Sequence, residues 1–261
     1  MSYLRSASVI LALCATACVG GELASSVWPP EDFDLVVDEL RNDGAGAHVI
    51  RRLSVRADGV VIYGTSSAPL VDAETGASFP VFERLCIYRL EPASVRALAR
   101  RLDRFGSGVE SSGQPASSEE SAQVTVSWRA FERRRRLTSG GRLRGAMGDI
   151  VALVASYLPP GEAFGIRMTR PVVPVVRGVP EPAAGAQGAL AALRAQLEDR
   201  ADDPGVLLAA FALACRVGER GAAEQLLQRW RAASTARAGT DGEGRQQAQA
   251  AAMRRMLPPT D

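Results

Sequence analysis

Apolar and polar residues alternate in several short segments of the first half of the chain. Phe33, Leu35 and Val37 occupy every second position, which is typical of a half-buried strand. Five further segments are predicted as strands: 48–56, 60–64, 81–90, 124–128 and 135–139. The first two of these are separated by Ala57-Asp58-Gly59, and Asp-Gly between β-branched runs indicates a tight hairpin.

Two other segments space their apolar residues at helical intervals. The first begins at Glu91-Pro92, since proline is allowed in the first helical turn, and ends at Gly106. The second covers 142–158 and ends at Pro159-Pro160. The order β-β-β-β-α-β-β-α over 32–170 predicts an α+β domain, an antiparallel sheet backed by two helices. An exposed apolar face on the other side of that sheet would mark a binding surface.

The composition changes in the last third of the chain. Residues 171–188 are rich in proline and are predicted to be a linker. Residues 189–233 are rich in alanine and leucine, with the apolar spacing of an all-α helical hairpin. Residues 234–261 are a low-complexity C-terminal tail, in which 246–256 is predicted as a frayed helix.

The stretch from Asp203-Pro204 to Trp230 resembles one unit of the tetratricopeptide repeat family. Gly218 stands at the turn and Ala223 at a small packing position, whereas Phe211 departs from the family because it replaces a small residue. Such units are stable in stacks of about three or more, and one is visible here. A generic helical hairpin is therefore the alternative interpretation.

The first residues contain a charged start that ends at Arg5, an apolar run over 9–13, and the small residues Ala15-Thr16-Ala17 before Cys18. The apolar region has about a dozen residues, shorter than the roughly 20 that a transmembrane helix needs. This arrangement resembles the signal peptide and lipobox of bacterial lipoproteins, although Ala15 stands where leucine is commoner. An ordinary cleaved secretory signal is the alternative interpretation.

The lipoprotein resemblance implies that residues 1–17 are removed and that Cys18 carries acyl chains. Several acyl chains would fix the protein stably to a lipid membrane. Residues 18–31 would then be a flexible tether, rich in small residues and closed by two prolines. The expected location is the bacterial cell envelope, at the outer membrane or the periplasmic face of the inner membrane.

Composition limits the chemistry of the chain. All 31 basic residues are arginine, so a Schiff-base lysine, a Ser–Lys dyad and a phosphate-loop lysine are excluded. The net charge of +2 argues against a nucleic-acid partner. His48 is the single histidine, and no G-x-S-x-G motif accompanies it. We therefore expect no recognisable catalytic residue, no metal site and no cofactor.

Two residue groups each permit two interpretations. Cys86 and Cys215 either pair as a disulfide in an oxidising compartment or are small buried apolar residues. The run Arg133-Arg134-Arg135-Arg136 either contacts an anionic surface near the anchor or is a solvated strand edge that prevents aggregation.

Together these features predict a membrane-anchored envelope lipoprotein that acts as a non-enzymatic binding or scaffolding module for an envelope protein partner. The alternative is an envelope hydrolase that uses a carboxylate pair not recognisable from sequence. Such an enzyme would need two or more Asp or Glu side chains converging in a concave pocket.

Overall fold

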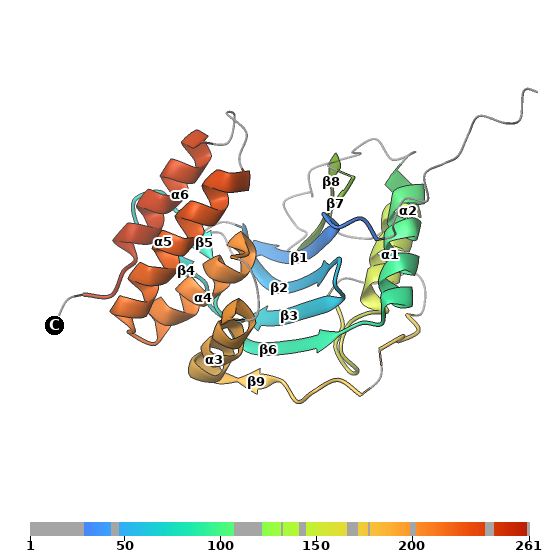
Figure 1. The fold of residues 1–261 in the computed structure, drawn as a ribbon, viewed down its shortest axis with the longest axis horizontal. Helices are drawn as coiled ribbons and strands as arrows, with labels where there is room; N and C mark the ends of the chain where they lie inside the picture. Colours follow the sequence, from blue (N-terminus) through green and yellow to red (C-terminus); the bar gives the residue numbers. More distant parts are fainter. Residues whose placement is uncertain are drawn as a thin grey trace, which may run out of the picture.

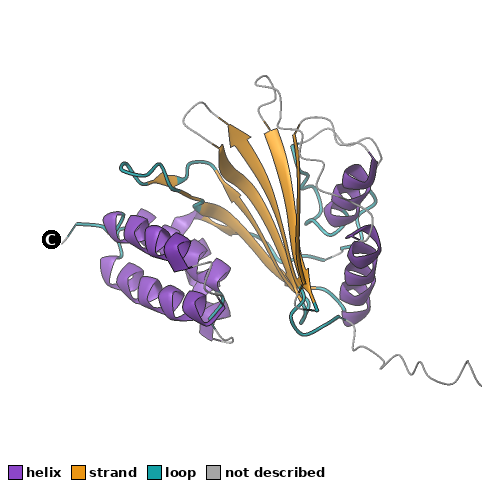
Figure 2. Ribbon diagram, turned by 90° about the horizontal axis from the view of Figure 1, so that it is seen from above, coloured by secondary structure: helices purple, strands orange, loops and turns teal. Residues whose placement is uncertain are grey.

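A computed structural model of the chain describes residues 29–42, 47–106, 122–131, 133–140, 145–165, 172–176, 178–198, 202–237 and 243–259. Within these residues a seven-stranded sheet has helices on both faces (Figures 1 and 2). Every pairing is antiparallel, in the order β8-β7-β1-β2-β3-β6-β9. The predicted α+β class is confirmed.

The strands follow the alternation in the sequence. They are β1 Asp34–Asn42, β2 Ala47–Arg56, β3 Val60–Ser66, β6 Phe82–Arg89, β7 Ala122–Ala130, β8 Arg133–Gly140 and β9 Ala183–Ala184. The turn between β2 and β3 places Gly59 at a φ of 84°, a conformation that glycine adopts without strain. A separate pair, β4 Leu70–Val71 and β5 Ser78–Phe79, projects between β3 and β6 as a short hairpin.

Helices α1 Pro92–Gly106 and α2 Gly145–Ala155 cover one face of the sheet, as predicted. Before the register shift that follows Glu39 on β1, the odd-numbered residues of β1 and their partners on β2 point to this face, and Leu35, Val37, Leu53 and Val55 are each fully buried there. These side chains belong to the hydrophobic core between the sheet and the two helices. The face is apolar across the sheet, so the two helices bury their own apolar stripes against it.

Four helices lie on the opposite face: α3 Gly185–Glu198, α4 Pro204–Arg216, α5 Arg220–Arg237 and α6 Glu243–Arg255. The segment predicted as a linker contributes β9, which pairs with Arg84 and Leu85 of β6. The segment predicted as a low-complexity tail contributes α6, in which Ala250 and Met253 are buried. The residues of α6 favour a helix, but they show little amphipathic spacing, and packing against α5 stabilises the helix.

The C-terminal helices cover only the part of this face that β3 and β6 form. Phe82 and Leu85 of β6 are buried in one apolar cluster with Leu193 of α3 and Phe211 of α4. On the rest of this face the residues are largely charged or hydroxylated, so helices do not cover them: they are the even-numbered residues of β8, the odd-numbered residues of β7, and residues such as Asp34, Asp38, Arg52, Ser54 and Arg56 of β1 and β2. The second sheet face is therefore apolar where it is covered and polar where it is open, which differs from the exposed apolar face considered above.

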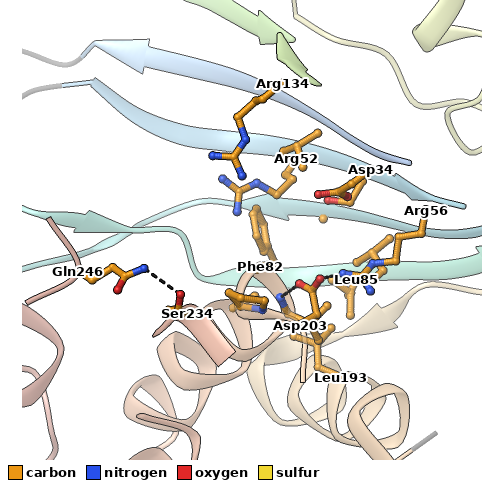
Figure 3. A pocket seen from close by; sticks show the side chains of 18 of the residues that line it. Asp34, Arg52, Arg56, Phe82, Leu85, Arg134, Leu193, Asp203, Ser234 and Gln246 are labelled. Carbon is orange, nitrogen blue, oxygen red and sulfur yellow. Dashed lines mark hydrogen bonds and ion pairs between the residues drawn. The ribbon is translucent and has the colours of Figure 1, made fainter. Parts of the chain in front are cut away.

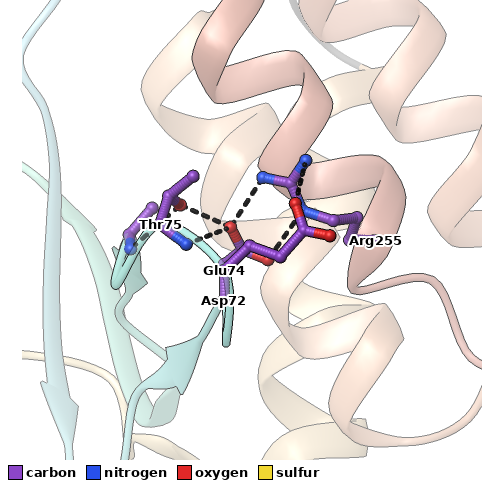
Figure 4. Close-up of polar contacts among 5 residues, drawn as sticks. Asp72, Glu74, Thr75 and Arg255 are labelled. Carbon is purple, nitrogen blue, oxygen red and sulfur yellow. Dashed lines mark hydrogen bonds and ion pairs between the residues drawn. The ribbon is translucent and has the colours of Figure 1, made fainter.

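One polar contact ties the last helix to the β4–β5 hairpin (Figure 4). The guanidinium of Arg255 donates to both carboxylate oxygens of Asp72, at 2.9 and 2.7 Å, and reaches Glu74 at 3.1 Å. Asp72 also accepts from the backbone N–H of Thr75 at 3.2 Å and from the Thr75 hydroxyl. The hydrogen bonds from Arg255 and then Thr75 lower the pKa of Asp72 below its ordinary range.

This contact predicts a pH-dependent stability. The pKa of Asp72 is lower in the folded state than in the unfolded state. Its contribution to the free energy of unfolding is therefore complete above the ordinary carboxyl pKa of about 4, and it is lost as the pH falls through the folded-state pKa. Asp72→Asn should lower the urea unfolding midpoint at pH 7, and the gap from the parent should narrow as the pH drops from 4 towards 2.

Glu74→Gln is the matched control because Glu74 meets the same arginine but is 68% exposed. Its midpoint should stay close to that of the parent at both pH values. A gap for Asp72→Asn that is unchanged at acid pH would contradict the assigned role.

Candidate ligand-binding cleft

A cleft of about 510 Å³ lies between the open part of the sheet and the C-terminal helices (Figure 3). Its floor is the even-numbered face of β1, β2 and β3, and its far wall comes from α3, α4, α5 and α6. The cleft exists because the helices pack on the apolar strands β3 and β6 and leave the polar strands β1 and β2 uncovered. The sheet register and the helix packing therefore create the site together.

The floor has a neutral centre between two charged rows. Hydrogen-bonded register places three residues side by side on adjacent strands of this central row: Val36, Ser54 and Ile62. On one side of it Asp38 lies opposite Arg52, and on the other side Asp34 lies opposite Arg56. Opposite charges directly across an antiparallel pair stabilise that register.

The first charged row is held by a bidentate ion pair. Arg52 donates through Nε and Nη2 to the two carboxylate oxygens of Asp38, at 2.6 and 3.0 Å. Its guanidinium also lies over the ring of Phe82, 5.8 Å from the centroid, within the range of a cation–π contact. Gly64 lies beneath that ring, where a Cβ atom would approach the Phe82 side chain to 2.7 Å. Glycine at this position lets the Phe82 ring pack flat on β3, and the ring in turn supports the guanidinium of Arg52.

The second charged row joins the sheet to the helical layer. Arg56 forms an ion pair with Asp203, which precedes α4. Asp203 is 7% exposed, and its Oδ1 accepts from the backbone N–H of Val206 at 2.9 Å, so it is the N-cap of α4. One carboxylate therefore both starts the helix and attaches it to β2.

Two other arginines line the cleft. Arg134 reaches in from β8 and Arg245 from α6, and both are exposed. Within the described part of the chain neither contacts a carboxylate. A further cavity of about 350 Å³ adjoins the cleft, since Asp34, Arg56, Arg134 and Asp203 line both. Four arginines and two aspartates line the cleft itself, so its charge is positive, whereas five arginines and five carboxylates line the two cavities together.

A second cavity, of about 320 Å³, lies on the other face of the sheet against the proline-containing segments 159–160 and 178–182. Glu162 in its wall accepts from the Tyr63 hydroxyl at 3.0 Å and pairs with Arg84 at 2.9 Å. Burial, followed by the neighbouring Glu162, raises the pKa of Tyr63. Tyr63, Arg84 and Glu162 therefore form one hydrogen-bonded and ion-paired group in the wall of this cavity.

The two cysteines of the folded body are free thiols on opposite faces of the sheet. Cys86 belongs to the core under α1 and α2, and its Sγ donates to the backbone carbonyl of Pro180 at 3.5 Å. Cys215 packs against the helical core around α4. Burial raises the pKa of both thiols, that of Cys215 to about 12, so both are protonated and unreactive at neutral pH.

The structure divides the arginine run between two faces. On β8, Arg134 and Arg136 point to the cleft side, whereas Arg133 and Arg135 point to the side of α1 and α2, because neighbouring strand residues alternate. Arg135 is half-buried and lies opposite Trp128. The run is therefore not one continuous patch, and one of its members lines the cleft. The predicted lipidation residue, Cys18, lies outside the described residues.

Several cleft residues were not identified from the sequence, namely Asp34, Asp38, Arg52, Arg56, Asp203 and Arg245. The spacing of four residues between Asp34 and Asp38, and between Arg52 and Arg56, was an available signal, because residues an even number of positions apart share one face of a strand. Among the described residues, no three or more His, Cys, Asp and Glu side chains gather as metal ligands. Nor has any described helix both the length and the apolar character needed to cross a membrane.

The chain matches no protein-family model and no curated protein. The residues of the cleft are therefore the basis on which a function is inferred.

Asp203 provides a test of how the cleft is held together. Asp203→Ala removes both the helix cap and the ion pair, whereas Asp203→Asn keeps an oxygen that caps α4. Both variants should lower the free energy of unfolding in urea, the alanine variant by about 1 kcal/mol more, which is the usual value of a cap.

Asp202→Asn serves as the control because the neighbouring Asp202 pairs with Arg229 at an exposed site. This substitution should lower the free energy of unfolding by no more than about 1 kcal/mol. Equal destabilisation by Asp203→Ala and Asp203→Asn would show that the cap contributes nothing.

Proposed function

We propose that the protein is a lipid-anchored bacterial envelope lipoprotein that acts as a non-enzymatic binding module and takes up a partner in its cleft. The observation that carries the proposal is the pair of exposed arginines, Arg134 and Arg245, which enter the cleft from two layers of the fold without a carboxylate partner among the described residues. An anionic ligand would supply the missing charge. The anchor rests on the resemblance of the leader to lipoprotein signal peptides.

An envelope hydrolase with a carboxylate pair is the second candidate, because Asp34 and Asp203 both line the cleft. Asp203, however, caps α4 and pairs with Arg56, so it is not free to exchange a proton with a substrate. Asp34 lies opposite Arg56 on the neighbouring strand. The geometry therefore favours binding over hydrolysis.

The anchor is tested by palmitate labelling of the full chain in bacterial cells. The parent should incorporate label and fractionate with membranes, and Cys18→Ala should lose both properties, because the acylated thiol is removed. Cys14→Ala is the matched control, since Cys14 falls in the segment that is cleaved away, and it should behave as the parent. Label retained by Cys18→Ala would contradict the anchor.

The cleft is tested by placing a photoreactive phenylalanine analogue at Ser54, in the centre of the floor, and illuminating living cells. A discrete crosslinked product should form, because a partner in the cleft would contact this position. The same analogue at Gln225, an exposed position of α5 that does not line the cleft, should yield no such product. Absence of a product at Ser54, or identical products at both positions, would contradict binding in the cleft.

A further inference from the structure

The positive charge of the cleft is concentrated at its rim. On the floor, Arg52 is paired with Asp38, and Arg56 with Asp203. Asp34, which lies opposite Arg56, adds a third carboxylate to the floor. The floor therefore carries one excess negative charge, and the positive charge that a ligand meets lies at Arg134 and Arg245.

The two rim arginines belong to different layers. Arg134 extends from β8 towards the floor in Figure 3, and Arg245 belongs to α6 in the helical wall of the cleft. A guanidinium offers a planar fork of donors that matches the two oxygens of a carboxylate. A ligand with acidic groups at two points along its length could thus be held from both sides.

The shape of the site favours an extended ligand. The cleft continues past Asp34 and Arg56 into the adjoining cavity, so it is a trough with an open end. Glu31, Asp32 and Asp58 line that cavity, so the acidic groups of a ligand would lie in the cleft itself and not beyond it. Pockets for compact small molecules are usually enclosed and lined mainly by apolar and aromatic groups. Here the site is open at one end, and its central row offers one hydroxyl, that of Ser54, between the apolar side chains of Val36 and Ile62.

The aromatic residues of the site do not offer a stacking surface. Phe82 and Phe33 line the cleft and the adjoining cavity, and each is 2% exposed. Phe82 is further enclosed by Gly64 on one side and Arg52 on the other. A ligand that binds by stacking a sugar ring or a base would find no free ring face here, whereas a peptide chain needs only polar and apolar contacts along its length.

We propose that the cleft binds an extended acidic peptide segment of a partner protein, with Arg134 and Arg245 each holding a carboxylate from opposite sides. The Ser54 hydroxyl and the side-chain amide of Gln246 line the path between them and supply polar contacts for the peptide backbone. This inference rests on the proposed function as a binding module and names the class of its partner.

The test uses the full folded chain from Cys18 onward and a fluorescent hexaglutamate peptide, with binding followed by anisotropy at low salt. Hexaglutamate should bind, and hexaglutamine should not. The double variant Arg134→Glu/Arg245→Glu should raise the Kd at least about tenfold, and the affinity of the parent should fall as salt is added, since exposed charges are screened. Arg134→Gln/Arg245→Gln should weaken binding in the same direction but less.

Arg133→Glu/Arg254→Glu is the matched control. It makes the same change in net charge on the same strand and the same helix, at exposed residues that do not line the cleft. Its Kd should remain within about twofold of the parent, because binding depends on position rather than total charge. Equal weakening by both double variants, or no binding of hexaglutamate, would overturn the inference. Far-UV circular dichroism and urea midpoints check that each variant is folded.

A hexameric oligogalacturonate of equal charge distinguishes peptide from acidic glycan. Weaker binding of the glycan supports the peptide assignment, and tighter binding of the glycan overturns it. Failure of this inference is separable from failure of the proposed function. A crosslinked product at Ser54 in cells with no hexaglutamate binding would reject the acidic peptide alone, whereas the absence of that product would reject binding in the cleft altogether.

Discussion

The second face of the sheet changes from apolar to charged part of the way across, and the rest of the architecture depends on that change. Ile62, Leu85 and Phe82 offer an apolar surface on β3 and β6, and the C-terminal helices bury it. On β1 and β2 the same face carries Asp38, Arg52 and their neighbours, whose burial under apolar helices would cost several kcal/mol per uncompensated charge. The helical layer therefore covers half of the sheet, and the cleft is the space that remains.

Ion pairs let this polar half of the face remain ordered without a cover. Arg52 and Asp38 bind through two hydrogen bonds, and Phe82 limits the movement of the guanidinium. Arg56 reaches across to Asp203 and so sets the distance between β2 and the start of α4. Half-buried ion pairs of this kind add modest stability. They do fix how the two side chains are oriented, because a guanidinium group donates to a carboxylate in few orientations. The side chains of Arg52 and Arg56 on the floor of the cleft are thus held in place by their carboxylate partners.

Local patterning was sufficient to predict the sheet and the two helices that back it. The alternation around Leu35 and Val37 and the helical spacing after Pro92 are patterns among residues close in sequence, so one sequence is enough to detect them. The cleft depends instead on strand register, which places Asp38 beside Arg52, and on the docking of distant helices. Arg245 illustrates the limit: the sequence predicted a frayed helix over 246–256, but it did not predict that this helix packs against α5 and brings Arg245 to the cleft. The arginine run was read as one linear feature, whereas strand alternation assigns its members to two faces.

The proposed anchor and the cleft are related by their positions along the chain. Glu31 and Asp32 line the cavity that continues the cleft, so the trough opens where the folded body meets the segment assigned as a tether. Residues 18–28 could span at most about 40 Å at roughly 3.5 Å per residue. A lipid at Cys18 would therefore keep the cleft within that distance of the bilayer, where a partner confined to the same membrane has a high effective concentration. Under such confinement a modest intrinsic affinity would be sufficient for a complex, which would fit an open cleft with two rim arginines.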